Sequence, residues 1–110
     1  MRPRHAVQTN SKKEESQSVM TKELMSLDYP QEGETIAGPN YSFRISAPQD
    51  APMVELCINQ GPWQLCRQAI GFWWFDCSDL TRGLYQARAR MHTNDGKVKL
   101  TLLRRFQVAQ

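Results

Sequence analysis

The sequence has no hydrophobic run that approaches the roughly 20 apolar residues needed to cross a lipid bilayer. Its opening residues 1–18, MRPRHAVQTNSKKEESQS, also lack the continuous apolar segment of a secretory signal. We therefore expect no membrane span. We also expect a cytoplasmic location, unless the chain is a segment of a larger exported protein.

Motifs that would indicate catalysis or metal binding are also lacking. The sequence contains no glycine-rich phosphate-binding loop and no nucleophile motif. His5 and His92 do not stand at metal-ligand spacing from a cysteine or a carboxylate. Asp76 and Asp79 flank an expected turn, where aspartate normally caps the backbone. We predict a protein that is not an enzyme and that uses no cofactor and no metal ion.

Cysteine is scarce and odd in number, with Cys57, Cys66 and Cys77 only. Their spacings do not match the Cys-x-x-Cys pattern of zinc and redox sites. Reduced thiols are the expected state, because persistent disulfides are rare in a reducing compartment. A Cys57–Cys66 bridge across a hairpin is the alternative.

Charge of one sign is not concentrated in the part of the chain that is expected to fold. Residues 28–110 carry nine Lys and Arg against eight Asp and Glu, so this part is nearly neutral. A dedicated nucleic-acid binder usually carries a strong positive field. We therefore predict no nucleic-acid partner.

A smaller basic strip is nevertheless expected on one strand, where Arg88 and Arg90 share a face. It is either a solvated surface or a site for an acidic or anionic partner. Further cations are expected near it: Arg82, Lys97 and Lys99.

The chain divides into two parts. Residues 1–27 are mostly polar and form an expected flexible leader, disordered or partly helical, with a short amphipathic turn over Thr21–Leu27. Residues 28–110 form the expected folded domain.

Within that domain, apolar and polar residues alternate with the period of half-buried strands. About seven short strands without a convincing helix predict an all-β sandwich. The expected strands are Thr35–Ala37, Tyr41–Ala47, Met53–Asn59, Trp63–Arg67, Phe72–Asp76, Leu84–His92 and Lys97–Ala109.

Turn residues predict how several strands connect. Gln60-Gly61 is expected to form a tight turn in which Gly61 takes a positive φ, and Asp95-Gly96 a type I′ hairpin turn. Along the last strand, alternate residues from Val98 to Val108 share one phase. A bulge near Arg104-Arg105 is expected to turn Arg104 outward.

Leu80-x-x-Gly83-x-Tyr85 resembles the tyrosine corner of immunoglobulin-like and fibronectin type III-like sandwiches. The wider pattern, from Val54-x-Leu56 through Gly71-x-Trp73 to Asp95-Gly96, is similar to early-set immunoglobulin-like domains. That group includes bacterial immunoglobulin-like repeats and glycogen- and starch-binding modules. The resemblance implies an antiparallel sandwich in which Leu80 and Gly83 are structural and the Tyr85 hydroxyl bonds backbone across the corner.

The three tryptophans are the main candidates for a binding site. Trp73 and Trp74 are adjacent in a strand, so one is expected in the core and the other on the outer face. Trp63 either packs over a turn or contacts a ligand. In glycogen-binding modules a Trp at this position stacks on sugar rings, but the second Trp that follows the Asp-Gly turn there is replaced here by Lys97 and Val98.

These observations predict a non-catalytic immunoglobulin-like module that mediates protein interaction or serves as an accessory domain. The alternative is a carbohydrate-binding module of the glycogen or starch type that uses Trp63. The expected partner is an unknown protein or a polysaccharide, and the chain is expected to be a monomer or a weak dimer. The candidate ligand-binding residues are Trp63, Trp73, Trp74, Arg88 and Arg90.

Overall fold

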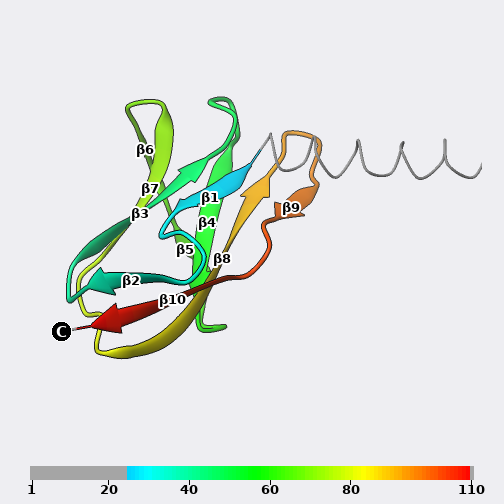
Figure 1. Ribbon diagram of the computed structural model, residues 1–110. Helices are drawn as coiled ribbons and strands as arrows, with labels where there is room; N and C mark the ends of the chain where they lie inside the picture. Colours follow the sequence, from blue (N-terminus) through cyan, green and yellow to red (C-terminus); the bar gives the residue numbers. More distant parts are fainter. Residues whose placement is uncertain (1–24, 110) are drawn as a thin grey trace, which may run out of the picture.

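The computed structural model describes residues 25–109, which form ten short strands in two sheets (Figure 1). The predicted leader lies largely outside the described residues. The strands are β1 Ser26–Tyr29, β2 Glu34–Ala37, β3 Tyr41–Ser46, β4 Met53–Ile58, β5 Gln64–Leu65, β6 Arg67–Ala69, β7 Phe72–Cys77, β8 Gly83–His92, β9 Val98–Leu100 and β10 Arg104–Ala109.

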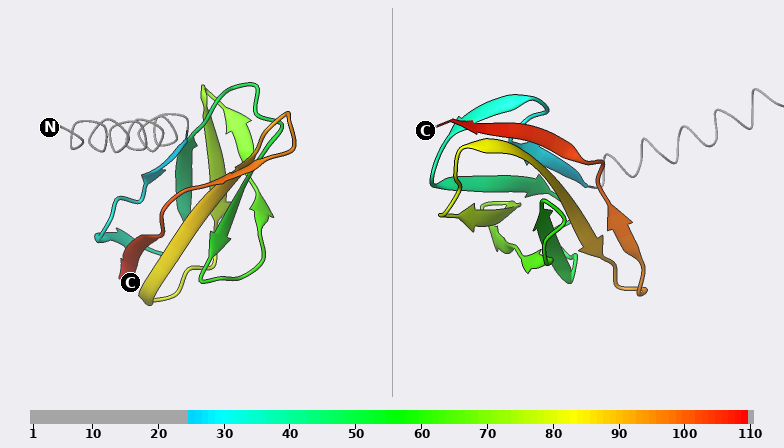
Figure 2. Two further views of the ribbon diagram at one scale, coloured as in Figure 1. Left: turned by 90° about the vertical axis from the view of Figure 1, so that its right-hand side faces the viewer. Right: turned by 90° about the horizontal axis from the view of Figure 1, so that it is seen from below.

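The two sheets pack face to face (Figure 2). The four-stranded sheet has the order β1-β3-β7-β6, and the six-stranded sheet has the order β2-β10-β8-β4-β5, with β9 also paired to β8. All pairings are antiparallel except that of β2 with β10. The prediction of an all-β, immunoglobulin-like sandwich is confirmed.

The core lies between the sheets and consists of the inward residue of each alternating pair. Phe43, Ile45, Val54, Leu56 and Val108 are among its fully buried side chains. The remaining members of this buried cluster are Met25, Leu27, Ile36, Trp73, Leu80, Ala87, Ala89, Met91 and Phe106.

β1 begins before the expected start of the domain. Leu27 is buried, and the Ser26–Tyr29 strand pairs with β3. The strand therefore crosses the boundary expected between residues 27 and 28, and Ser26 and Leu27 of the expected amphipathic turn belong to a sheet. The division into leader and domain stays a prediction.

The strand predicted over Trp63–Arg67 is divided in the structure. Gln64 and Leu65 pair with β4, whereas Arg67–Ala69 pairs with β7 in the other sheet. The crossing occurs at Cys66, whose amide donates to Val54 O at 2.9 Å. The prediction of one strand over Trp63–Arg67 is wrong here, because alternation does not show where a chain changes sheets.

Two turns also differ from the prediction. After β4, Asn59 and Gln60 have positive φ values of 53° and 61°, and Gly61 does not take this conformation. The Gly61 amide donates to Ile58 O at 2.9 Å, so the type I′ turn lies one residue earlier than expected. After β8, Gly96 alone has a positive φ, so the Asp95-Gly96 turn is not type I′.

A β-bulge separates β9 from β10. The Thr101 amide donates to Ala89 O, and Arg104 pairs with Ala87. Leu102 and Leu103 therefore lie opposite the single residue Arg88. The extra residue reverses the phase of the strand. The predicted bulge near Arg104-Arg105 is thus misplaced by about two residues.

The consequence of this bulge is visible in the burial of the two strands. Phe106 and Val108 on β10 are buried, whereas Val98 and Leu100 on β9 are each 48% exposed. The expectation that these four side chains share one face is therefore wrong.

The tyrosine corner connects the two sheets between β7 and β8. The Tyr85 hydroxyl donates to Thr81 O at 2.7 Å and accepts from the Thr81 amide at 3.1 Å. Leu80 is buried, and its amide donates to Pro39 O. This is the arrangement that the family resemblance implies.

The β6–β7 turn contains a strained residue, which gives a first prediction. Ile70 has a φ of 54° and is 88% exposed. A β-branched residue in the left-handed region costs roughly 1–2 kcal/mol, and asparagine tolerates that region better. Ile70→Asn should therefore raise the free energy of unfolding by about 1 kcal/mol in urea titrations. Ile70→Val keeps the strain and should give no gain; an equal gain in both variants would contradict this account.

Candidate functional site

The tryptophan pair is divided between the core and an outer face. Trp73 is 6% exposed and belongs to the core. Trp74 is half-buried on the outer face of the four-stranded sheet, where its Nε1 donates to Ala69 O at 2.9 Å. The Arg67 guanidinium lies 6.0 Å from the centre of the Trp74 ring. Trp74 is thus engaged by its own strand neighbours.

The rest of this face is similarly self-contained. The Arg44 guanidinium lies 4.0 Å from the Phe72 ring centre and 4.8 Å from that of Tyr29. Arg44 Nε also donates to Asp28 at 3.1 Å, and the Ser46 hydroxyl donates to the same carboxylate. Cation–π contacts and hydrogen bonds therefore occupy this arginine.

A second ion pair completes the same face. Arg67 donates two hydrogen bonds to Asp76, and the Ser42 hydroxyl donates a third. The hydrogen bond from Arg67 has the largest effect and that from Ser42 the next largest, and together they hold the pKa of the Asp76 carboxyl below its ordinary value. The charged side chains Arg44, Arg67, Asp28 and Asp76 on the outer face of the four-stranded sheet are thus paired with one another.

The opposite outer face is arranged differently. Strand pairing places Leu65, Glu55, Arg90 and Leu100 in one row across β5, β4, β8 and β9. The next row contains Met53, His92 and Val98. We call this surface, together with Trp63 and Arg88, the β4–β8–β9 face.

A compact ion cluster lies at the middle of the β4–β8–β9 face. Arg90 Nε donates to Glu55 Oε1 at 2.7 Å, and His92 Nε2 lies 2.8 Å from the same oxygen. Burial opposes ionisation of Glu55, but the hydrogen bonds from Arg90 and His92 outweigh it and lower the pKa of this carboxyl. Glu55 therefore fixes Arg90 in place.

Trp63 covers this cluster. The Arg90 guanidinium carbon lies 4.2 Å from the centre of the Trp63 ring. The indole is half-buried and follows the Asn59–Gln60 turn, which directs it back over the sheet. A cation–π contact of this kind contributes about 0.5–1 kcal/mol at an exposed site. One ring face of Trp63 is thus occupied by Arg90.

Exposed apolar side chains surround the ion cluster. Leu65 lies at the β5 edge of this face and is 67% exposed. Val98 and Leu100 lie at the β9 edge of the same face and are also exposed. Leu102 and Leu103 of the bulge extend this apolar margin. Large apolar side chains gathered on one sheet face are unusual for a surface that meets only water.

Arg88 differs from its neighbour Arg90. Its side chain is half-buried, and its Nε is buried without a hydrogen-bond partner among the described residues. Lys97 lies 4.0 Å from Asp95, and Lys99 pairs in register with buried Met91. The structure therefore brings Arg88 and Arg90 onto one face and gives a carboxylate only to Arg90; the role of this basic strip stays a prediction.

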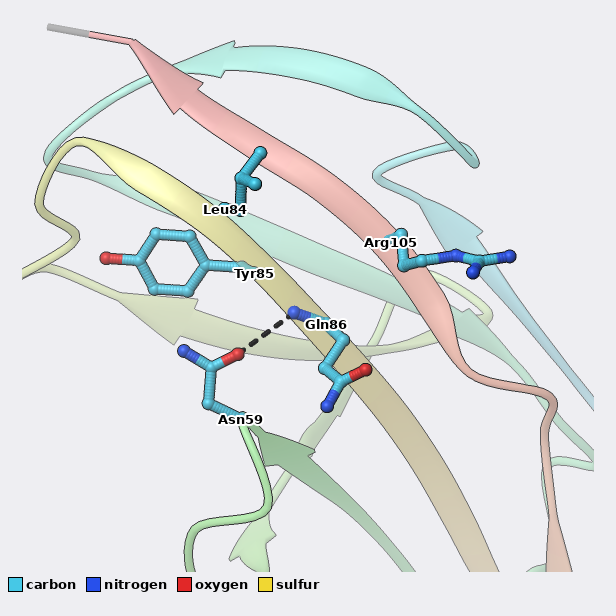
Figure 3. A pocket seen from close by; sticks show the side chains of 5 residues that line it. All are labelled: Asn59, Leu84, Tyr85, Gln86 and Arg105. Atoms are coloured by element: carbon cyan, nitrogen blue, oxygen red, sulfur yellow. Dashed lines mark hydrogen bonds between the residues drawn. The ribbon is translucent and has the colours of Figure 1, made fainter.

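A shallow hollow of about 270 Å³ lies at the other end of the six-stranded sheet (Figure 3). It is lined by Asn59, Leu84, Tyr85, Gln86 and Arg105. Asn59 Oδ1 accepts a hydrogen bond from the backbone N–H of Gln86 at 3.0 Å, and Arg105 Nε donates to Glu32 at 3.0 Å. Its polar groups are thus partly used within the chain.

The cysteines are three free thiols, so the alternative of a Cys57–Cys66 bridge is not realised. Burial, with a smaller contribution from Glu55, raises the pKa of Cys66 to about 12, which keeps it protonated. Within residues 25–109, no group of three or more His, Cys, Asp or Glu side chains is placed to bind a metal ion. The same residues contain no helix that could span a membrane.

Known structures share the fold. The fibronectin(III)-like modules of CbhA from Clostridium thermocellum align with a TM-score of 0.60 and 18% identity, over 76% of this chain and 93% of theirs. CopC from Methylosinus trichosporium OB3b aligns with a TM-score of 0.51 and 16% identity, over 72% of this chain and 85% of its own. An engineered protein aligns with a TM-score of 0.64 and 17% identity, over 78% of this chain and 20% of that protein.

These likenesses establish the fold alone. No protein-family model matches the chain, and no curated protein matches it by sequence. The chain is therefore an immunoglobulin-like, fibronectin(III)-like β-sandwich, and its function must be argued from its own surface.

Sequence reasoning missed most of the β4–β8–β9 face. It selected Trp63, Arg88 and Arg90 but not Glu55 or His92. Glu55 and Arg90 both occupy outward positions of predicted strands, so the sequence was compatible with a salt bridge between them. The missing information was the pairing register, which places them opposite each other.

The lowered pKa of Glu55 gives a prediction about acid stability. Its ionised form stabilises the fold fully above an unfolded-state pKa of about 4.3, and this contribution is lost as the pH falls through the lower folded-state pKa. Wild type should therefore melt above Glu55→Gln at pH ~5, and the difference should narrow towards pH ~3. Asp50→Asn, which removes an exposed carboxylate, should follow wild type. A pH-independent gap between wild type and Glu55→Gln would contradict the assignment.

Proposed function

We propose that the chain is a non-catalytic immunoglobulin-like module that binds a protein partner through the β4–β8–β9 face. The observation that carries this proposal is the group of exposed apolar side chains, Leu65, Val98 and Leu100, around a half-buried tryptophan and two arginines. Such a combination is typical of interaction surfaces, where Trp and Arg supply much of the binding energy.

The contrast between the two outer faces supports this choice of surface. On the four-stranded sheet, Arg44 and Arg67 are each paired with a carboxylate and lie near aromatic rings. On the six-stranded sheet, Leu65 and Leu100 are exposed, and Arg88 has no ion-pair partner in residues 25–109. A partner gains more by desolvating the second surface.

The edge of β9 favours a partner other than a second copy of the chain. A two-fold antiparallel pairing centred on Lys99 would set two lysines directly opposite each other, which is destabilising. This supports the sequence-based expectation of a monomer or a weak dimer.

The alternative of a glycogen- or starch-type module that uses Trp63 receives less support. Arg90 occupies one face of the indole, and no second tryptophan shares the β4–β8–β9 face, since Trp73 is buried and Trp74 lies on the other sheet. Sugar binding would therefore depend on one remaining ring face. Affinity electrophoresis on glycogen, starch and β-glucans, with Trp63→Ala as control, separates the two proposals.

Two finer expectations accompany the proposal. Membership of the early-set immunoglobulin-like domains, including bacterial repeats, is supported by the tyrosine corner on which the resemblance rests. A cytoplasmic location, or another reducing compartment, is supported by the three free thiols.

Site-specific photocrosslinking tests the proposed function. Benzoylphenylalanine in place of Leu65 or Leu100 should capture one and the same protein, identified by mass spectrometry, from a lysate of the source cells. The same probe at Ile70, which is more exposed than either residue but lies on the other sheet, should not capture it. Adding Trp63→Ala should reduce capture from Leu100 at least tenfold, if the indole is an anchor worth about 1.4 kcal/mol or more. Equal capture from Ile70 would contradict the proposal.

A further inference from the structure

Arg88 is the least satisfied cation of the β4–β8–β9 face. Its side chain is half-buried, its Nε is buried without a hydrogen-bond partner, and no carboxylate in residues 25–109 forms an ion pair with it. Arg90, two residues along the same strand, forms an ion pair with Glu55 and a cation–π contact with Trp63. The two arginines therefore have different roles.

The surroundings of Arg88 are mainly apolar. Cys57 pairs with it on β4, and Leu102 and Leu103 lie opposite it at the bulge. Leu102 is 76% exposed and Leu103 41% exposed, so both remain available to a partner. Arg88 thus lies among apolar groups at the end of the β4–β8–β9 face that is next to the bulge.

A buried N–H without an acceptor is unfavourable, and a charged donor forms a stronger hydrogen bond than a neutral one. A guanidinium also matches a carboxylate in a two-point geometry. An incoming carboxylate would therefore meet a cation that is already partly desolvated and makes no ion pair that must first be broken.

We propose that Arg88 binds a carboxylate of the protein partner, so that the β4–β8–β9 face takes a segment in which an acidic side chain is flanked by apolar ones. This inference rests on the proposed function and specifies the chemistry of its partner. The acidic group would contact Arg88, and the apolar groups would contact Leu100 and Leu102.

The charge balance favours a protein segment over a polyanion. Glu55 neutralises Arg90, and Asp95 lies beside Lys97. Of the two outward arginines of β8, Arg88 is then the one that forms no ion pair within residues 25–109. Nucleic acids and sulfated polysaccharides need several cations along their length, whereas a single carboxylate needs one.

Peptide selection tests the inference. Full-length chain is immobilised and used to select from a phage-displayed library of random dodecapeptides. Selected peptides are then synthesised with a fluorophore, and their affinities are measured by anisotropy. We expect enrichment of Asp or Glu flanked by apolar residues. Arg88→Met should weaken these peptides roughly 10- to 100-fold, and replacing the peptide's acidic residue by its amide should remove this sensitivity.

The control variants separate binding from folding. Arg82→Met removes an exposed arginine of the β7–β8 corner and should leave affinity unchanged. Arg88→Lys keeps the charge but not the two-point geometry and should bind with intermediate affinity. Arg88→Met should melt no lower than wild type, because it removes a buried donor that has no acceptor. A large loss of stability would contradict the inference.

The outcomes distinguish this inference from the proposed function. Peptides that lose affinity in Leu100→Ala but carry no acidic residue, or do not respond to Arg88→Met, would overturn the role of Arg88 and leave the interaction face intact. Selection that yields no peptide sensitive to Leu100→Ala or Trp63→Ala would overturn both. Heparin binding that disappears in Arg88→Met, without any peptide binding, would show that the surface takes a polyanion instead and would also contradict the inference.

Discussion

Glu55 determines how the β4–β8–β9 face is arranged. One of its oxygens accepts a hydrogen bond from Arg90 and lies within hydrogen-bond distance of His92, and Arg90 in turn supports Trp63. Without that carboxylate, Arg90 and His92 would lose the partner that they share, and Arg90 would no longer be held beneath the Trp63 indole. The partly buried ion pair therefore gives a small sandwich a surface with defined geometry, at a modest cost of desolvation.

The bulge at Leu102-Leu103 determines which side chains surround that ion pair. By inserting one residue opposite Arg88, it turns Val98 and Leu100 to the outside while Phe106 and Val108 stay in the core. A regular strand would bury β9's apolar residues and leave the face polar. Bulges are frequent next to functional surfaces, where they redirect side chains, and this one creates the apolar margin of the proposed interface.

The sandwich was predictable because alternation and the tyrosine corner are local signals, carried by residues such as Phe43, Ile45 and Tyr85. The site was less predictable because it depends on pairing between distant strands. The period of two placed Val98 and Leu100 in the same phase as Phe106 and Val108, and only the register of β8 with β9 and β10 shows the phase reversal. Likewise, alternation placed Trp73 and Trp74 on opposite faces but did not say which was buried.

The two outer faces differ: cation–π contacts and ion pairs occupy the four-stranded sheet, and the six-stranded sheet carries the surface proposed to bind a partner. The most direct test is methyl NMR of the labelled chain bound to its unlabelled partner, with saturation transferred from the partner. We expect attenuation of the methyl signals of Leu65, Val98 and Leu100, with that of Ile70 unaffected. Attenuation at Ile70 with no change at those three residues would contradict it.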